Sequence, residues 1–254
     1  KPPPEAPKPK PEDDLQLSFM DHLYELRDRL KKAVVMVLFT TIASYALADE
    51  IYTWLVQPVL DALPAAQRRL YFIDPVGPIF VNLKVSALAG VFLAAPYWLY
   101  QVWAFVAPGL YRRERRLVAP FLVLGTLLFA LGGWLAHQFM LPFAFQFIVE
   151  EFSGPDRQPM LDVGATLDIV LVMELAFGLV FELPLVLALL ARMGVVRSSW
   201  FAKHRRIAMV INVIVAAVIT PTGDPFNLML MALPMILFYE VGIIAARLVE
   251  PPED

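Results

Sequence analysis

The sequence predicts an all-α fold, that of a polytopic membrane protein with six transmembrane helices. Hydrophobic residues make up 59% of the 254 residues and charged residues only 18%, whereas about 25% of a typical soluble domain is charged. The charges are also unevenly placed, since 14 of the 45 lie in residues 1–32 and 31 remain for the other 222 positions. These 222 positions therefore contain long charge-free stretches, and a soluble fold is not expected to contain so many.

Several classes of protein are excluded by what the sequence lacks. There is no cysteine, so a disulfide framework, a thiolate metal site and a cysteine nucleophile are impossible. A net charge of -3 gives no argument for nucleic-acid binding. The motifs of P-loop, serine-hydrolase and zinc-protease sites do not occur. His22, His137 and His204 lie in separate segments, and we interpret them as ordinary interfacial histidines. We therefore expect no cofactor, no metal site and no enzymatic activity.

The N-terminal 32 residues divide into two parts. Residues 1–14 read KPPPEAPKPKPEDD, and this proline-rich composition predicts a disordered tail. Residues 15–32 place four large apolar side chains, from Phe19 to Leu30, on one helical face. Charged residues occupy the opposite face, which predicts an amphipathic helix at the membrane interface.

Six apolar spans follow in a predicted membrane domain of residues 33–249. Their approximate bounds are 33–48, 85–106, 117–138, 167–191, 207–220 and 226–246. A helix needs about 20 residues to cross the hydrocarbon core, so the first and fifth spans are short. Few residues separate the last two spans, which predicts a tight hairpin of two short helices. Pro142 is expected to help end the membrane part of the third span.

Lysine and arginine predict the orientation of the chain. Segments on the N-terminal side of the spans carry 17 of these residues, and segments on the other side carry 4. Because cytoplasmic loops are enriched in Lys and Arg, both termini should face the cytoplasm. The helix at 15–32 and a short tail at 250–254 are then cytoplasmic.

Two acidic residues lie within the fourth span. An ionised carboxylate inside a membrane costs about 2.5–3.5 kcal/mol on insertion scales and by default marks function. Glu182, in FELP, is either a protonated group hydrogen-bonded to a neighbouring helix, a contact for a partner helix, or a proton-linked site. Glu174 lies about 12 Å nearer the outside and is expected simply to reach the external interface.

Two further acidic residues lie on the predicted cytoplasmic side. Glu114, within RRERR, either balances the local charge or receives a cationic ligand. Glu25 can pair with Arg29 one helical turn away. Together Glu25 and Glu114 could hold two guanidinium groups, because arginine binds carboxylates through a planar fork.

Four segments in this order resemble the TatC family, the multispanning subunit of the twin-arginine protein translocase. They are HLYELRDRL at 22–30, APYWLYQVWAFVAPGLYRRERR at 95–116, FGLVFELP at 177–184 and TPTGD at 220–224. The resemblance covers about Phe19 to Val249. It implies six helices forming a concave, glove-like scaffold in the cytoplasmic membrane, with both termini cytoplasmic.

The resemblance also implies a function and a set of partners. The function is recognition of twin-arginine signal peptides on folded cargo proteins, with export driven by the proton-motive force. The partners are the signal peptides, the single-span subunits TatB and TatA, other copies of the chain and the lipid bilayer. The implied residues are Glu25, Arg27, Arg29, Phe105 and Glu114 for signal-peptide recognition, Glu182 for an intramembrane partner contact, and Pro58 and Asp224 in external loops.

The leading hypothesis is thus a receptor and scaffold. The competing hypothesis is a proton-coupled secondary transporter of a small solute, with Glu182 as the coupling carboxylate. Such transporters usually have internal repeats and interrupted helices near the membrane midplane, and we find no similarity between the two halves of this chain. A third hypothesis, a purely structural scaffold, would not explain the acidic side chains of Glu114 and Glu182.

Overall fold

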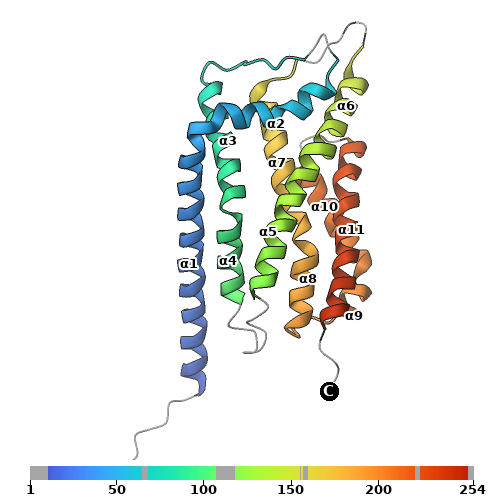
Figure 1. Ribbon diagram of the computed structural model, residues 1–254. Coiled ribbons are helices and arrows are strands. Elements are labelled where there is room, and N and C mark those ends of the chain that lie inside the picture. The colour runs from blue at the N-terminus through green and yellow to red at the C-terminus, as the bar shows by residue number, and fades with distance from the viewer. Residues whose placement is uncertain are drawn as a thin grey trace, which may run out of the picture.

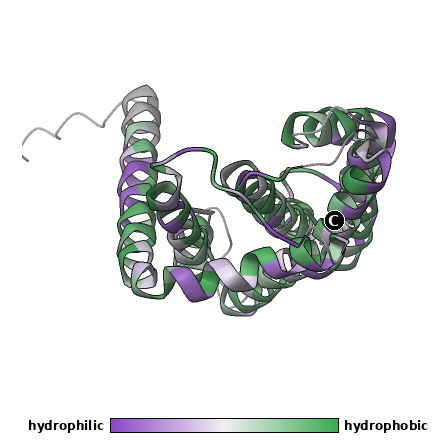
Figure 2. Ribbon diagram, turned by 90° about the horizontal axis from the view of Figure 1, so that it is seen from above, coloured by the Kyte–Doolittle hydropathy of each residue, from purple (hydrophilic) through white to green (hydrophobic). Residues whose placement is uncertain are grey.

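The fold is a bundle of helices that follows a curve open on one side. The computed structural model describes residues 11–64, 68–106, 118–154, 156, 160–220 and 224–250. Most helices run along a common direction (Figure 1), and the view from above shows the open, concave arrangement (Figure 2). The predicted all-α polytopic fold is therefore confirmed.

The first helix is longer than predicted. Helix α1 (Pro11–Ser44) continues through a short 3-10 turn, η1 (Tyr45–Leu47), into α2 (Ala48–Ala62). The predicted boundary between the tail at 1–14 and the helix at 15–32 is wrong, because α1 already includes residues 11–14 and continues past residue 32 into the first predicted span. Residues 12–44 contain neither Gly nor Pro, so nothing interrupts the helix where the charges end. The rest of the predicted tail, 1–10, lies outside the described residues.

Helix α2 lies across one end of the bundle (Figure 1), which we call the α2 end. From there α3 (Gly77–Leu93) and α4 (Ala95–Val106) return toward the opposite end, with a bend of 54° between them. The bend falls where Pro96 enters the first turn of α4, because proline cannot donate to the preceding turn and crowds its carbonyl.

The third predicted span continues past Pro142. Helix α5 (Val118–Leu135), the π-helical turn η5 (Ala136–Met140) and α6 (Leu141–Phe152) follow one another without a loop. The helix therefore does not end at Pro142, and because its 33 residues from Ala119 to Glu151 exceed one crossing, the end of the membrane part near Pro142 stays a prediction. Pro142 lies in the first turn of α6, where a missing backbone N–H is tolerated.

The last helices return the chain to the end where α1 begins. They are α7 (Val163–Phe181), α8 (Leu183–Arg192), α9 (Ser198–Lys203), α10 (Arg205–Ile219) and α11 (Pro225–Val249). Helix α10 has 15 residues, as expected of a short span, but α11 has 25. The prediction that both helices are short is wrong for α11, because the helix begins at Pro225 and continues through Pro234.

Four helices of the described chain are long and apolar enough to cross a membrane, or five if the bent pair α3 and α4 counts as one span. The remaining predicted span, at 207–220, corresponds to α10. At 1.5 Å per residue, its 15 residues extend about 22 Å, which is less than the roughly 30 Å hydrocarbon core.

Close approach of helix backbones holds the bundle together. Helix α1 packs against α3 and α4, α5 packs against α7, and α8 packs against α11. A Cβ atom at Gly90 would lie 2.7 Å from the backbone nitrogen of Thr41, and one at Gly132 would lie 2.5 Å from the carbonyl oxygen of Phe177. Glycine is required at both positions because no other residue leaves room for the facing backbone.

One short tie fastens the segment after α2 to the start of α7. The Tyr71 N–H donates to the Leu161 carbonyl at 3.0 Å, and the Val163 N–H donates to the Tyr71 carbonyl at 2.9 Å. The Asp162 carboxylate accepts from the N–H of Ala165 at 2.8 Å, which caps α7, and from the N–H of Ile73 at 3.3 Å. One side chain thus caps a helix and holds a distant strand-like segment.

Candidate functional site

Two apolar hollows lie on either side of α4. The α1–α4 hollow has a volume of about 430 Å³ and the α4–α8 hollow about 530 Å³. Both are lined by Trp98, Val102 and Phe105, so α4 forms a wall common to the two. The α1–α4 hollow adds apolar residues of α1 from Leu26 to Leu38, and the α4–α8 hollow adds those of α7 and α8 from Leu179 to Met193.

Phe105 is fixed near the end of α4 by a contact with α1. Its ring stacks on the imidazole of His22, with 4.2 Å between the ring centroids and 19° between the planes. His22 lines the α4–α8 hollow together with Phe105. This stacking joins the N-terminal part of α1 to α4 at the mouth of the hollows.

The acidic and basic residues predicted on α1 divide into two groups. Arg29 donates from Nε and Nη2 to the Glu25 carboxylate at 2.8 and 2.6 Å, as their spacing of one turn predicts. Arg29 lines the α1–α4 hollow, so this pair lies at its edge. Arg27 instead contacts Asp28 and lies over the Tyr24 ring at 5.3 Å. Glu114 lies outside the described residues.

Glu182 is buried at the break between α7 and α8. Only 8% of the residue is exposed, and it lines the α4–α8 hollow. The break is local, because the Glu182 N–H donates to the Leu179 carbonyl and Pro184 follows in the first turn of α8. A Cβ at Gly125 would lie 3.2 Å from Glu182 Oε2, so the absence of a side chain there leaves room for the carboxylate. Within the described chain, Oε1 accepts no hydrogen bond.

The two residues assigned to external loops have different positions in the structure. Pro58 is buried inside α2, the helix that lies between the first two predicted spans, so the predicted external segment is helical at this residue. The segment is helical because Leu55, Val56 and Val59 recur at helical spacing and are buried against the bundle. Asp224 is the N-cap of α11 and accepts from the Asn227 N–H at 2.8 Å.

A buried polar pair was missed in the sequence. His137 Nδ1 lies 2.9 Å from Glu174 Oε1, and the two side chains are 3% and 4% exposed. The imidazole also stacks on Trp54 of α2, with ring centroids 3.9 Å apart. Both side chains are therefore buried within the bundle and paired with each other, while their depth relative to the membrane interface stays a prediction. The sequence does show an ionisable residue within each of two apolar helices. It does not show that these two residues contact each other.

The arrangement suits an elongated ligand with an apolar stretch and a basic end. The hollows offer apolar surface, Glu25 offers a carboxylate at one edge, and Glu182 offers a buried acceptor in the second hollow. Among the described residues, no group of three or more His, Cys, Asp or Glu side chains is placed to hold a metal ion.

Comparison with known proteins identifies the family. A family model described as "Sec-independent protein translocase protein (TatC)" matches residues 21–234. Among proteins of that description, one from Halothiobacillus neapolitanus is 40% identical over 230 residues, which are 90% of this chain and 62% of that protein. One from Koribacter versatilis is 37% identical over 240 residues, which are 92% of this chain and 87% of that protein.

A solved structure agrees with these matches. The crystal structure described as the twin arginine translocase receptor TatC superposes with a TM-score of 0.81 at 34% identity, covering 90% of this chain and 99% of that one. A family model that covers most of the chain, relatives at this identity and the same fold together identify the protein. The chain belongs to the TatC family and is a multispanning membrane component of the twin-arginine protein translocase.

Proposed function

We propose that this chain is the receptor and scaffold subunit that binds twin-arginine signal peptides of folded cargo at the cytoplasmic face of the cytoplasmic membrane. Both termini then face the cytoplasm, in agreement with the excess of Lys and Arg on that side. The observation that carries the proposal is the pair of apolar hollows sharing Phe105, with Glu25 at one edge and Glu182 in the second hollow.

The two arginines of the signal would be held by carboxylates at the open end of the hollows. Glu25 is paired with Arg29 in the free protein, and these side chains are 33% and 24% exposed. A helical pair of this kind is worth only about 0.3–0.5 kcal/mol, so an incoming guanidinium can replace Arg29 at little cost. Glu114 would be the second carboxylate, and bidentate pairing would orient the signal. The apolar part of the signal would then lie in the hollows beside Phe105.

Glu182 would take part in assembly with a single-span partner. The residue lines the α4–α8 hollow, and its buried Oε1 atom accepts no hydrogen bond from the described residues. A hydrogen-bond donor on a partner helix would satisfy it, and such contacts in membranes are worth about 0.6–2 kcal/mol. TatB and TatA would be these partners, together with other copies of the chain. Export would be driven by the proton-motive force through the recruited subunits, because the sequence contains no P-loop.

The competing hypothesis of a proton-coupled solute transporter is not proposed further. Glu182 is the carboxylate on which it rested, and family membership places that carboxylate in a protein translocase component.

Signal binding is tested by photo-crosslinking a twin-arginine peptide to the membrane-inserted protein. We expect Glu25→Gln and Glu114→Gln each to lower the crosslinking yield, and the double variant to lower it further. Asp28→Asn is the matched control, because Asp28 is an exposed acid on the same helix and its carboxylate pairs with the neighbouring Arg27. Unchanged crosslinking in both single variants and in the double variant would refute the recognition assignment.

Partner assembly is tested by co-purification of TatB. We expect Glu182→Ala to reduce the recovered partner more than it reduces signal-peptide crosslinking. Glu182→Gln retains hydrogen-bonding capacity and should recover most of the loss. If Glu182→Ala instead abolishes crosslinking and leaves TatB recovery intact, Glu182 belongs to the signal site and the anchoring role is wrong.

A further inference from the structure

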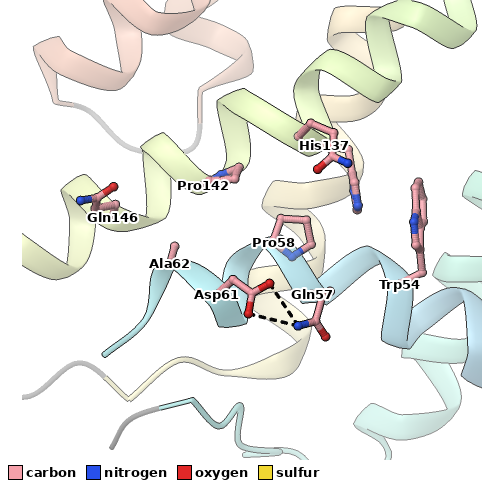
Figure 3. Close-up of a pocket in the computed structure, with 9 residues that line it drawn as sticks. Trp54, Gln57, Pro58, Asp61, Ala62, His137, Pro142 and Gln146 are labelled. Atoms are coloured by element: carbon pink, nitrogen blue, oxygen red, sulfur yellow. Dashed lines mark hydrogen bonds between the residues drawn. The ribbon is translucent and has the colours of Figure 1, made fainter. Parts of the chain in front are cut away.

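A third pocket lies at the α2 end, between α2 and α6, and shares no lining residue with the two hollows. Its volume is about 390 Å³. Figure 3 shows Trp54, Gln57, Pro58 and Asp61 on α2, facing His137 and Pro142 from the other side. We call it the α2–α6 pocket.

The floor of the α2–α6 pocket is held rigidly. Pro58 is buried, and His137 is fixed from behind by Glu174 and from the side by Trp54. The polar groups at the rim therefore stand on a defined surface, because the residues beneath them belong to helices and have fixed contacts.

The amides at the rim are oriented by carboxylates. Gln57 Nε2 lies 3.1 Å from both oxygens of Asp61, and Gln146 Nε2 lies 2.8 Å from Glu150 Oε1. An ionised carboxylate only accepts hydrogen bonds, so the NH₂ group of each amide must face it. The amide oxygens are left as acceptors. Together with Asp61 they favour a ligand that carries positive charge and several N–H donors, which is the chemistry of a primary ammonium.

The guanidinium of Arg68 lies beside the Asp61 carboxylate. Arg68 Nη1 lies 3.7 Å from Asp61 Oδ1, and its Nε donates to the Leu63 carbonyl at 3.3 Å. Both charged side chains are about half exposed, at 50% and 55%. An acidic and a basic group side by side complement a zwitterion, with the ammonium on Asp61 and a phosphate on Arg68.

An exposed apolar surface begins directly beside the α2–α6 pocket. Phe139 and Phe143 follow the lining residues Gln138 and Pro142, and they are 45% and 53% exposed. Trp134 of α5 contacts Phe139 and continues this surface toward the middle of the bundle. Trp54, at the pocket itself, is an exposed aromatic residue of the kind that lies at membrane–water interfaces. A ligand with acyl chains would find apolar surface immediately next to its polar head.

We propose that the α2–α6 pocket binds the headgroup of a zwitterionic phospholipid with a primary ammonium, a phosphatidylethanolamine. The ammonium donates to Asp61 and to the amide oxygens of Gln57 and Gln146, and the phosphate lies toward Arg68. The acyl chains lie along Phe139 and Trp134. A bound lipid of this kind would fasten the α2 end to the bilayer at a defined depth, independently of any signal peptide in the hollows.

The test is native mass spectrometry of the full chain released from detergent with added lipid. Three lipids with identical acyl chains are compared, bearing ethanolamine, choline or glycerol headgroups. Choline keeps the positive charge but donates no N–H hydrogen bond, and phosphatidylglycerol has no ammonium. We expect retention of the ethanolamine lipid to exceed that of the choline lipid by about two- to fivefold, the scale of one partly exposed charge contact.

The variant is Asp61→Asn, and the matched control is Glu50→Gln, which changes an exposed acid on α2 outside the pocket. We expect Asp61→Asn to remove the ethanolamine preference and Glu50→Gln to keep it. The proposal is overturned if the choline or glycerol lipid is retained as well as the ethanolamine lipid, if Asp61→Asn keeps the preference, or if Glu50→Gln loses it. The summed emission of the five tryptophans, Trp54 among them, shows whether each variant keeps the fold of the parent.

Discussion

Separating the buried pair of His137 and Glu174 should destabilise the bundle. The pair joins η5 to α7 through one contact of 2.9 Å between side chains that are 3% and 4% exposed. His137→Leu leaves the Glu174 carboxylate buried without this partner, which costs about 1–3 kcal/mol. It also removes the ring stacking on Trp54, worth about 0.5–1.5 kcal/mol. We therefore expect a loss of about 1.5–4.5 kcal/mol in the free energy of unfolding.

The two contributions can be separated by choosing the replacement. His137→Phe keeps a ring against Trp54 and removes the polar contact alone, so it should cost about 1–3 kcal/mol. The double variant His137→Phe/Glu174→Leu removes both polar groups and should recover to within about 1 kcal/mol of the parent, since an apolar pair can replace a buried polar one. With Glu174→Leu measured as the second single variant, the coupling free energy follows from the double-mutant cycle.

The assay is unfolding in mixtures of dodecyl maltoside and SDS, followed by tryptophan fluorescence. Trp54 is one of the five tryptophans that contribute to the signal, and its ring lies 3.9 Å from that of His137. The reasoning is refuted if both single variants unfold within about 0.5 kcal/mol of the parent, the range of ordinary surface changes. It is equally refuted if the double variant is no more stable than His137→Phe.

Two further variants test the packing and the capping of helices. Gly132→Ala should destabilise the protein by about 1–3 kcal/mol, because the added Cβ would lie 2.5 Å from the Phe177 carbonyl oxygen, whereas Gly154→Ala meets nothing within 4 Å and should stay within about 0.5 kcal/mol. Equal effects of these two substitutions in the same unfolding assay would contradict the close approach of α5 and α7. Asp224→Ala should cost about 0.5–2 kcal/mol by removing the cap of α11, and Asp224→Asn should retain most of the stability.

Composition was sufficient to predict the fold because the bilayer restricts the solutions. A chain with so many apolar stretches must pair its backbone groups within each span, so helices are the expected result. Glu182 could be found in the same way, since a carboxylate inside an apolar helix stands out against its neighbours. The sequence could not predict that Glu182 lines the α4–α8 hollow together with Phe105, because this depends on how α4 and α8 pack.

The boundaries of the helices were harder to predict from the sequence. The charged residues before Ala33 mark the predicted passage of the chain from water into the bilayer. The helix continues across this boundary, because its backbone hydrogen bonds form in both surroundings. Pro142 is a helix breaker in most contexts, and the π-helical turn before it allows the chain to continue. His137 and Glu174 lie 37 residues apart on different helices, so only three-dimensional packing reveals that they are partners.

The tie between Tyr71 and the start of α7 sets an order of events during synthesis. Its two halves lie 89 positions apart, which a ribosome needs about 5–20 s to cover at 5–20 residues per second. Until α7 emerges, the N–H and carbonyl of Tyr71 have none of the partners they have in the finished fold, and α3 to α6 must already have been made. The contacts that complete the α2 end therefore form only after every element from α3 to α6 has been synthesised.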